Sequence, residues 1–183
     1  LKANDLLRTS LISTKKNLTK DSPLKINDVR IVDNYSPIRK IRDEVKALLE
    51  MTNVILPRNV RLEVSHHYGI EKFYHYGITM INIINHSYCK KLIIVLPGQK
   101  HPAQFHKVKE ESFFILHGSI NLTLDKKKYI MKPGDLKTIK KKMVHEFYSK
   151  NGAVIEELST EHVKSDSFYL DKKIDNNKYR KSF

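Results

Sequence analysis

The chain has 183 residues, of which 40% are hydrophobic, and a formal net charge of +14 at pH 7. This length and composition predict one domain, or one domain with an extension, and no apolar run is long enough to span a bilayer. The single cysteine, Cys89, cannot form an internal disulfide, and no secretion signal is visible. We therefore expect a cytoplasmic protein without a membrane partner.

The positive charge allows two interpretations. Clustered Lys and Arg side chains are typical of nucleic-acid surfaces. Here the basic residues are spread along the chain among acidic ones, and the lysine triplets at 126–128 and 140–142 are typical of solvated hairpin turns. We expect no nucleic-acid partner, and an anionic sugar would use the charge equally well.

One helix is predicted within residues 34–59. Ser36 suits the N-cap and Pro37 the first helical position, and Pro57 prevents continuation beyond about Asn53. The apolar side chains then recur at helical spacing, at Ile38, Ile41, Val45, Leu48 and Leu49. We expect this helix to cover a barrel end or a dimer seam.

Residues 60–163 are predicted to form short strands separated by turn residues. The candidate strands fall near 60–64, 78–84, 91–96, 112–116, 120–124, 129–131, 147–148 and 154–158. Turn residues include Pro133-Gly134 and Asn151-Gly152, and the second pair is a strong hairpin signal. Such spacing predicts a mainly all-β fold, either a β-barrel or a jelly roll.

Four side chains in this region could hold a divalent cation. Gln104 and His106 leave the same face of an extended strand, Glu111 follows closely, and His145 returns on a separate strand. Two imidazoles, a carboxylate and an amide oxygen suit Zn²⁺ or Mn²⁺. His101 lies three residues before Gln104, an offset that places it on the opposite strand face.

This set has weaknesses that leave an alternative open. His106 and His145 could be two satisfied core histidines without a metal. The amide oxygen of Gln104 is neutral and a poorer ligand than an imidazole, so the affinity should be lower than that of a three-histidine site.

The residues of this set resemble the two motifs of the cupin superfamily, in which His-x-His, a nearby Glu and a later His ligate one metal inside a double-stranded β-helix. Gln104 stands where that pattern has its first histidine, as in the similar zinc set of phosphomannose isomerases. The match extends to Gly118 and to Pro133-Gly134-Asp135. The resemblance implies a cupin barrel at residues 60–163.

The match is closer to the cupin attached to sialic acid synthases and related nonulosonic acid synthases. Its blocks resemble Ser-His-His-Tyr-Gly at 65–69, Asn-His-Ser-Tyr-Cys-Lys-Lys at 85–91, Leu-Pro-Gly-Gln-Lys-His-Pro at 96–102 and Glu-Glu-Leu-Ser-Thr-Glu-His at 156–162. We assign substrate binding to His66, His67 and Lys91 within these blocks. Adjacent histidines on a strand point to opposite faces, however, and are more often packing residues.

Both ends of the chain extend the same resemblance. Residues 6–32, within an extension at 1–33, look like part of the antifreeze-like (SAF) domain of these synthases, although a plain arm packing as an edge strand is an equal alternative. The tail at 164–183 contains a family-like Asp-Ser-x-Tyr segment, so we expect it to pack on the barrel or on a partner subunit. The chain does not open with methionine, so we expect a fragment or a processed form.

Lys109 and Glu157 are the candidate catalytic residues, because the chain also resembles D-lyxose isomerase-type cupins. In such a site a metal polarises a sugar carbonyl and stabilises an enediolate while a base moves a proton between adjacent carbons. The alternatives are that Lys109 is a surface lysine and that Glu157 forms an ion pair with nearby lysines.

Two functions follow from these observations. The first is a metal-dependent sugar isomerase or epimerase, linked to nonulosonic acid synthesis and acting as a homodimer on a sugar or sugar acid. The second is a non-catalytic sugar-binding or oligomerising module of a synthase-like protein, which a catalytic barrel encoded upstream would favour. A third possible function is that of an iron cupin that uses oxygen, but no specific feature of the sequence supports it.

Overall fold

A computed structural model describes residues 36–58 and 60–182. The predicted extension at 1–33 with its SAF-like element, and the N-cap assigned to the Ser36 side chain, lie outside what it describes. The helices are α2 (Ser36–Glu50), α3 (Phe73–Tyr76) and α4 (Lys172–Asp175), with 3₁₀ turns η2 (Ile70–Lys72) and η3 (Lys164–Asp166). No helix in these two ranges is long and apolar enough to cross a membrane.

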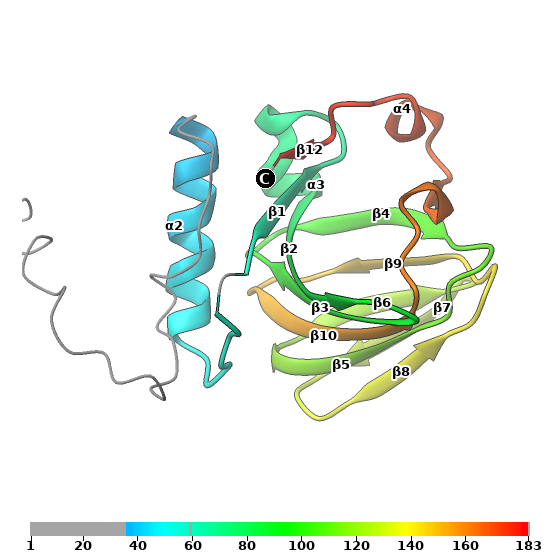
Figure 1. Ribbon diagram of the computed structural model, residues 1–183, viewed down its shortest axis with the longest axis horizontal. Helices are drawn as coiled ribbons and strands as arrows, with labels where there is room; N and C mark the ends of the chain where they lie inside the picture. The colour runs from blue at the N-terminus through cyan, green and yellow to red at the C-terminus, as the bar shows by residue number, and fades with distance from the viewer. Residues whose placement is uncertain (1–35, 59, 183) are drawn as a thin grey trace, which may run out of the picture.

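Two antiparallel sheets form the body of the molecule (Figure 1). The seven-stranded sheet runs in the order β12 (Lys181–Ser182), β1 (Leu62–His66), β2 (Gly77–Asn85), β3 (Tyr88–Val95), β10 (Ala153–Thr160), β5 (Glu111–Gly118) and β8 (Leu136–Ile139). The five-stranded sheet runs in the order β11 (Phe168–Tyr169), β4 (Lys100–Phe105), β9 (His145–Tyr148), β6 (Ile120–Leu124) and β7 (Lys127–Met131). This jelly roll confirms the predicted mainly β fold.

The continuous apolar run on β3 is explained by burial on both faces of the strand. Ile93 and Val95 belong to the core between the sheets, whereas Leu92 and Ile94 pack with the apolar face of α2. Successive strand residues point to opposite faces, so a strand covered on both sides needs no polar alternation. Helix α2 therefore packs on the outer face of the seven-stranded sheet (Figure 1), and its expected place at a dimer seam stays a prediction.

The turn residues behave differently at two sites. Asp125 and Lys126 adopt positive φ values of 42° and 73° and connect β6 to β7 as a hairpin. Asn151-Gly152 does not close a hairpin, because β9 lies in the five-stranded sheet and β10 in the other. The hairpin prediction there was wrong, since the chain uses this turn to cross between the sheets.

The C-terminal tail returns to the barrel and adds a short strand to each sheet. β11 pairs with β4, where Tyr169 lies opposite Gln104, and β12 pairs with β1. Between these strands, the Tyr68 hydroxyl donates to Asp171 Oδ2 at 2.7 Å, and Asn177 Nδ2 donates to the His67 carbonyl at 3.2 Å. The tail thus lies beside the residues predicted to form the site.

Candidate metal centre

A β-bulge in β4 determines which side chains reach the interior. His101 lies opposite Phe147 and Gln104 opposite His145, so three steps along β4 match two steps along β9. The extra residue places His101 and Gln104 on the same face. Both line one buried cavity, and the prediction that His101 faces the other way was wrong.

Backbone carbonyls orient the two candidate histidine ligands. His106, immediately after β4, donates from Nδ1 to the Asp166 carbonyl at 2.6 Å, and His145 donates from Nδ1 to the Met143 carbonyl at 3.2 Å. Each Nε2 is then the unprotonated nitrogen that carries the lone pair. Burial lowers the pKa of His106 despite the opposing charge of Glu111, which keeps this imidazole neutral as a metal ligand requires.

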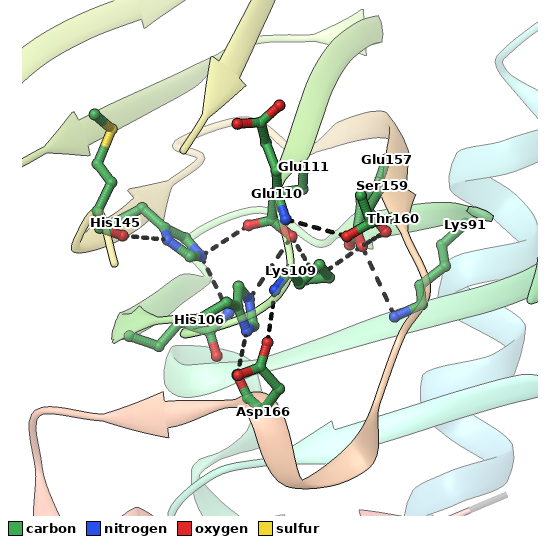
Figure 2. A network of polar contacts seen from close by, with 12 residues as sticks. Lys91, His106, Lys109, Glu110, Glu111, His145, Glu157, Ser159, Thr160 and Asp166 are labelled. Atoms are coloured by element: carbon green, nitrogen blue, oxygen red, sulfur yellow. Dashed lines mark hydrogen bonds and ion pairs between the residues drawn. The ribbon is translucent and has the colours of Figure 1, made fainter. Parts of the chain in front are cut away.

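The carboxylate of Glu111 lies between the two imidazoles (Figure 2). Its Oε1 is 3.1 Å from His145 Nε2, and its Oε2 is 3.7 Å from His106 Nε2. One ligand atom from each of these residues lies within 4.8 Å of the others. Zinc ligands bound at about 2.1 Å in tetrahedral geometry lie about 3.4 Å apart, so the spacing suits one ion.

Buried polar atoms without hydrogen-bond partners indicate whether these four side chains suit a cation. Among the residues that the structure describes, buried Gln104 Oε1, His106 Nε2 and Glu111 Oε1 have no hydrogen-bond partner. The amide nitrogen of Gln104 lies 3.2 Å from His145 Nε2. Buried acceptors without donors are costly, and a cation among them would relieve that cost. The donor set therefore fits a divalent ion.

Lys109 and Glu157 meet in the same cavity (Figure 2). Lys109 Nζ lies 2.9 Å from Glu157 Oε1 and also contacts Glu111 Oε2, while Lys91 Nζ lies 3.8 Å from Glu157 Oε1. Lys109 is only 4% exposed, which excludes the surface-lysine alternative. The ion-pair alternative for Glu157 is present in the structure.

Electrostatics keep both partners of this pair charged. Burial alone would lower the pKa of Lys109, but the carboxylates of Glu157 and Glu111 outweigh it and raise that pKa. Burial would likewise raise the pKa of Glu157, but Lys109 and Lys91 outweigh it and lower that pKa. At neutral pH the pair is therefore an ammonium and a carboxylate.

The three predicted substrate-binding residues do not all reach the cavity. His67 and Lys91 line it, whereas His66 is not among the lining residues. Neighbouring positions at a strand end face opposite sides, which separates the two histidines. His67 Nε2 lies 3.0 Å from the Tyr169 hydroxyl, and burial lowers the His67 pKa to about 4.

The cavity has a volume of about 40 Å³ and includes residues that sequence reasoning missed: His101, His162, Ser167, Tyr169, Arg180 and Lys181. Four of these come from the tail. The family-like Asp-Ser-x-Tyr segment was the only signal pointing to them. The bulge that turns His101 inward had no sequence signal beyond Pro102, which cannot donate a strand hydrogen bond.

Comparisons with known proteins agree with this fold. Residues 91–156 match the family model described as a cupin domain. No curated protein matches the chain.

Solved structures similar to this chain include two L-ribose isomerases. The Cellulomonas parahominis enzyme with L-psicose has a TM-score of 0.65 at 13% identity, covering 81% of this chain and 97% of that one. The Geodermatophilus obscurus enzyme has a TM-score of 0.55 at 14% identity, covering 62% of this chain and 81% of that one. At this identity the likeness concerns the fold alone.

Proposed function

We propose that this protein binds one divalent metal ion through Gln104, His106, Glu111 and His145 and isomerises or epimerises a carbohydrate. The observation that carries the proposal is the convergence of orphaned ligand atoms with the buried Lys109–Glu157 pair in one cavity. Zinc or manganese suits the mixed nitrogen and oxygen donors best.

The residues divide the chemistry between them. A bound metal would polarise the sugar carbonyl. Glu157, held as a carboxylate, accepts the proton from the carbon beside that carbonyl and returns it to the former carbonyl carbon, while the proton of the adjacent hydroxyl passes to the former carbonyl oxygen. Lys109, held as an ammonium, compensates the negative charge that develops on oxygen in between. His67 and Lys91 contact the sugar from the cavity wall.

The substrate and setting are further parts of the proposal. Sugar isomerases among the structural neighbours suggest a sugar or sugar acid as the substrate. The synthase-like blocks suggest a place in sialic or related nonulosonic acid synthesis. We also expect a cytoplasmic homodimer without nucleic-acid or membrane partners.

One observation favours a non-catalytic alternative. The cavity of about 40 Å³ has room for an ion and a few waters but not for a sugar, and tail residues form part of its wall. A sugar-binding or oligomerising module of a sialic acid synthase-like protein needs no larger active site. The enzyme proposal instead requires the tail to move when substrate enters.

Metal content and proton exchange test the two functions separately. We expect about one zinc or manganese per chain after purification without chelator, lost in His106→Ala and retained in His86→Ala, which changes an exposed histidine. Incubation with aldoses, ketoses and sugar acids in D₂O should place deuterium beside the carbonyl, and Glu157→Gln should abolish it. Metal binding without exchange would favour the module, and absence of metal after soaking would refute the centre.

A further inference from the structure

A carboxylate from the tail holds the loop that connects β4 to β5. Asp166 is 6% exposed and lies at the end of η3. Its Oδ1 accepts the backbone N–H groups of Lys107 at 2.9 Å and Val108 at 3.1 Å, and its Oδ2 accepts those of Val108 at 3.1 Å and Lys109 at 2.8 Å. One side chain thus satisfies three consecutive donors of this loop.

The main chain of the same residue orients a candidate ligand (Figure 2). The carbonyl of Asp166 accepts the Nδ1 proton of His106 at 2.6 Å, which leaves His106 Nε2 unprotonated and facing Glu111. Partners that fix the tautomer and the ring direction of a ligating histidine raise the affinity of the site for its metal. Asp166 supplies such a partner from a segment 60 residues further along the chain.

The loop held in this way carries much of the site. His106 precedes the three bound N–H groups, Lys109 is the last of them, and Glu111 begins β5 two residues later. Without the Asp166 carboxylate, these three backbone N–H groups would need water or another acceptor, and the loop could adopt other conformations. Docking of the tail therefore decides how these three side chains are placed relative to one another.

We propose that Asp166 is a positioning residue that couples docking of the C-terminal tail to metal binding at His106, Glu111 and His145. The inference rests on the proposed function. Coupling between two sites is reciprocal, so tail docking raises the metal affinity and metal binding in turn holds the tail on the barrel. Asp166 acts through the loop and through His106, not on a substrate.

Zinc alone is the probe for the first test. Its affinity is measured by competition with a chromophoric chelator for the full chain and for Asp166→Ala and Asp166→Asn, with unfolding midpoints recorded beside it. We expect the affinity to fall about 10-fold in Asp166→Ala, because the released loop lets His106 shift away from the Asp166 carbonyl that orients it. We expect a smaller fall in Asp166→Asn, which retains one acceptor oxygen, and altered visible bands of bound Co²⁺ in both.

Lys172→Ala is the control in the tail. The Lys172 side chain is 86% exposed and its Nζ lies 3.9 Å from Asp175 Oδ2 within the tail itself, so this change leaves the bonds between tail and barrel in place. We expect its zinc affinity to stay within about twofold of wild type. Folded Asp166 variants with wild-type zinc affinity would overturn the inference and leave the metal centre standing. Absence of zinc binding in the wild type would overturn both.

A second measurement needs no variant. Lys172 and Lys173 are exposed in the tail and are trypsin sites. If the coupling is reciprocal, saturating zinc should slow cleavage there several-fold, while cleavage at exposed Lys126 and Lys127 should keep its rate. Equal cleavage rates at the tail with and without zinc would overturn the coupling.

Discussion

Lys109 is surrounded by two carboxylates in a cavity that excludes most water. It contacts Glu111 and lies 2.9 Å from Glu157, and all three residues are at most 4% exposed. Removing one member of such a group leaves an uncompensated charge in the interior, whereas the complete group adds little net stability. The arrangement is therefore better explained by a function than by stability.

The first prediction concerns this group. Lys109→Met should lower the free energy of unfolding by about 3 kcal/mol at neutral pH, because Glu111 and Glu157 lose the ammonium between them and Glu157 keeps Lys91 at 3.8 Å. Adding Glu157→Gln should recover part of the loss. Urea denaturation measures both.

An exposed pair provides the control for that measurement. Lys100 pairs with Glu146 at 2.9 Å, with side chains 43% and 31% exposed, so Lys100→Met should cost less than about 1 kcal/mol. Similar losses for Lys100→Met and Lys109→Met would contradict the importance of the buried charges.

At the scale of elements, irregularities in the strands shape the site more than their regular parts do. The bulge between His101 and Gln104 brings both side chains inward. A second register shift, between Val154 and Ile155, lies where β10 begins beside the end of β5. Gly118, at that end, has a φ of +70°, and a Cβ added there would lie 2.1 Å from the Gly152 carbonyl oxygen.

The second prediction compares two glycines of similar backbone conformation. Gly134 has a φ of +93°, but an added Cβ would meet no atom within 4 Å. Gly134→Ala should therefore cost only the conformational strain, about 1 kcal/mol. Gly118→Ala adds a backbone clash to the same strain and should lower the unfolding midpoint much further. Equal unfolding midpoints for the two variants would contradict this, because they would mean that the end of β5 moves away from Gly152 without cost.

At the scale of the whole molecule, the barrel buries several neutral imidazoles. Burial lowers the pKa of His67 to about 4 and that of His162 to about 3, and it lowers the pKa of His101 well below its ordinary value. An unfolded chain binds protons at these positions below about pH 6.5, whereas the folded chain binds one at His67 only near pH 4 and one at His162 only near pH 3. Stability is therefore complete above pH 6.5 and decreases as the pH falls toward 4.

The third prediction isolates one of these groups. Between pH 7.5 and pH 4.5 the wild type should lose stability, and His67→Gln should lose up to about 3 kcal/mol less over the same range. The free energy of unfolding in urea at several pH values measures this. An unchanged pH dependence in His67→Gln would mean that His67 has the same pKa in the folded and the unfolded chain.

Much of the architecture follows from local pattern. Alternating apolar residues and turn residues predicted the strands and the mainly β fold, because the two-residue strand period and the 3.6-residue helix period depend only on neighbouring positions. The spacing of Gln104, His106, Glu111 and His145 likewise predicted a donor set that the structure brings together. Lys109 and Glu157 were named separately, and the structure places them in contact.

Other features depended on residues far apart in the chain. The inward turn of His101 and the crossing of Asn151-Gly152 between the sheets were mispredicted, and the sequence did not indicate that α2 packs on the outer sheet face. Each depends on which strand or sheet a segment meets, and the local sequence pattern does not contain that information.

The sequence by itself determined the strand content, the cupin-like residue pattern and the candidate ligands, since these depend on residue type and short spacing. Only the tertiary structure decided that the tail lines the cavity and that Asp166 holds the loop carrying His106. The bond between His106 and Asp166 spans 60 residues, and it forms only because both sheets of the barrel have assembled around it.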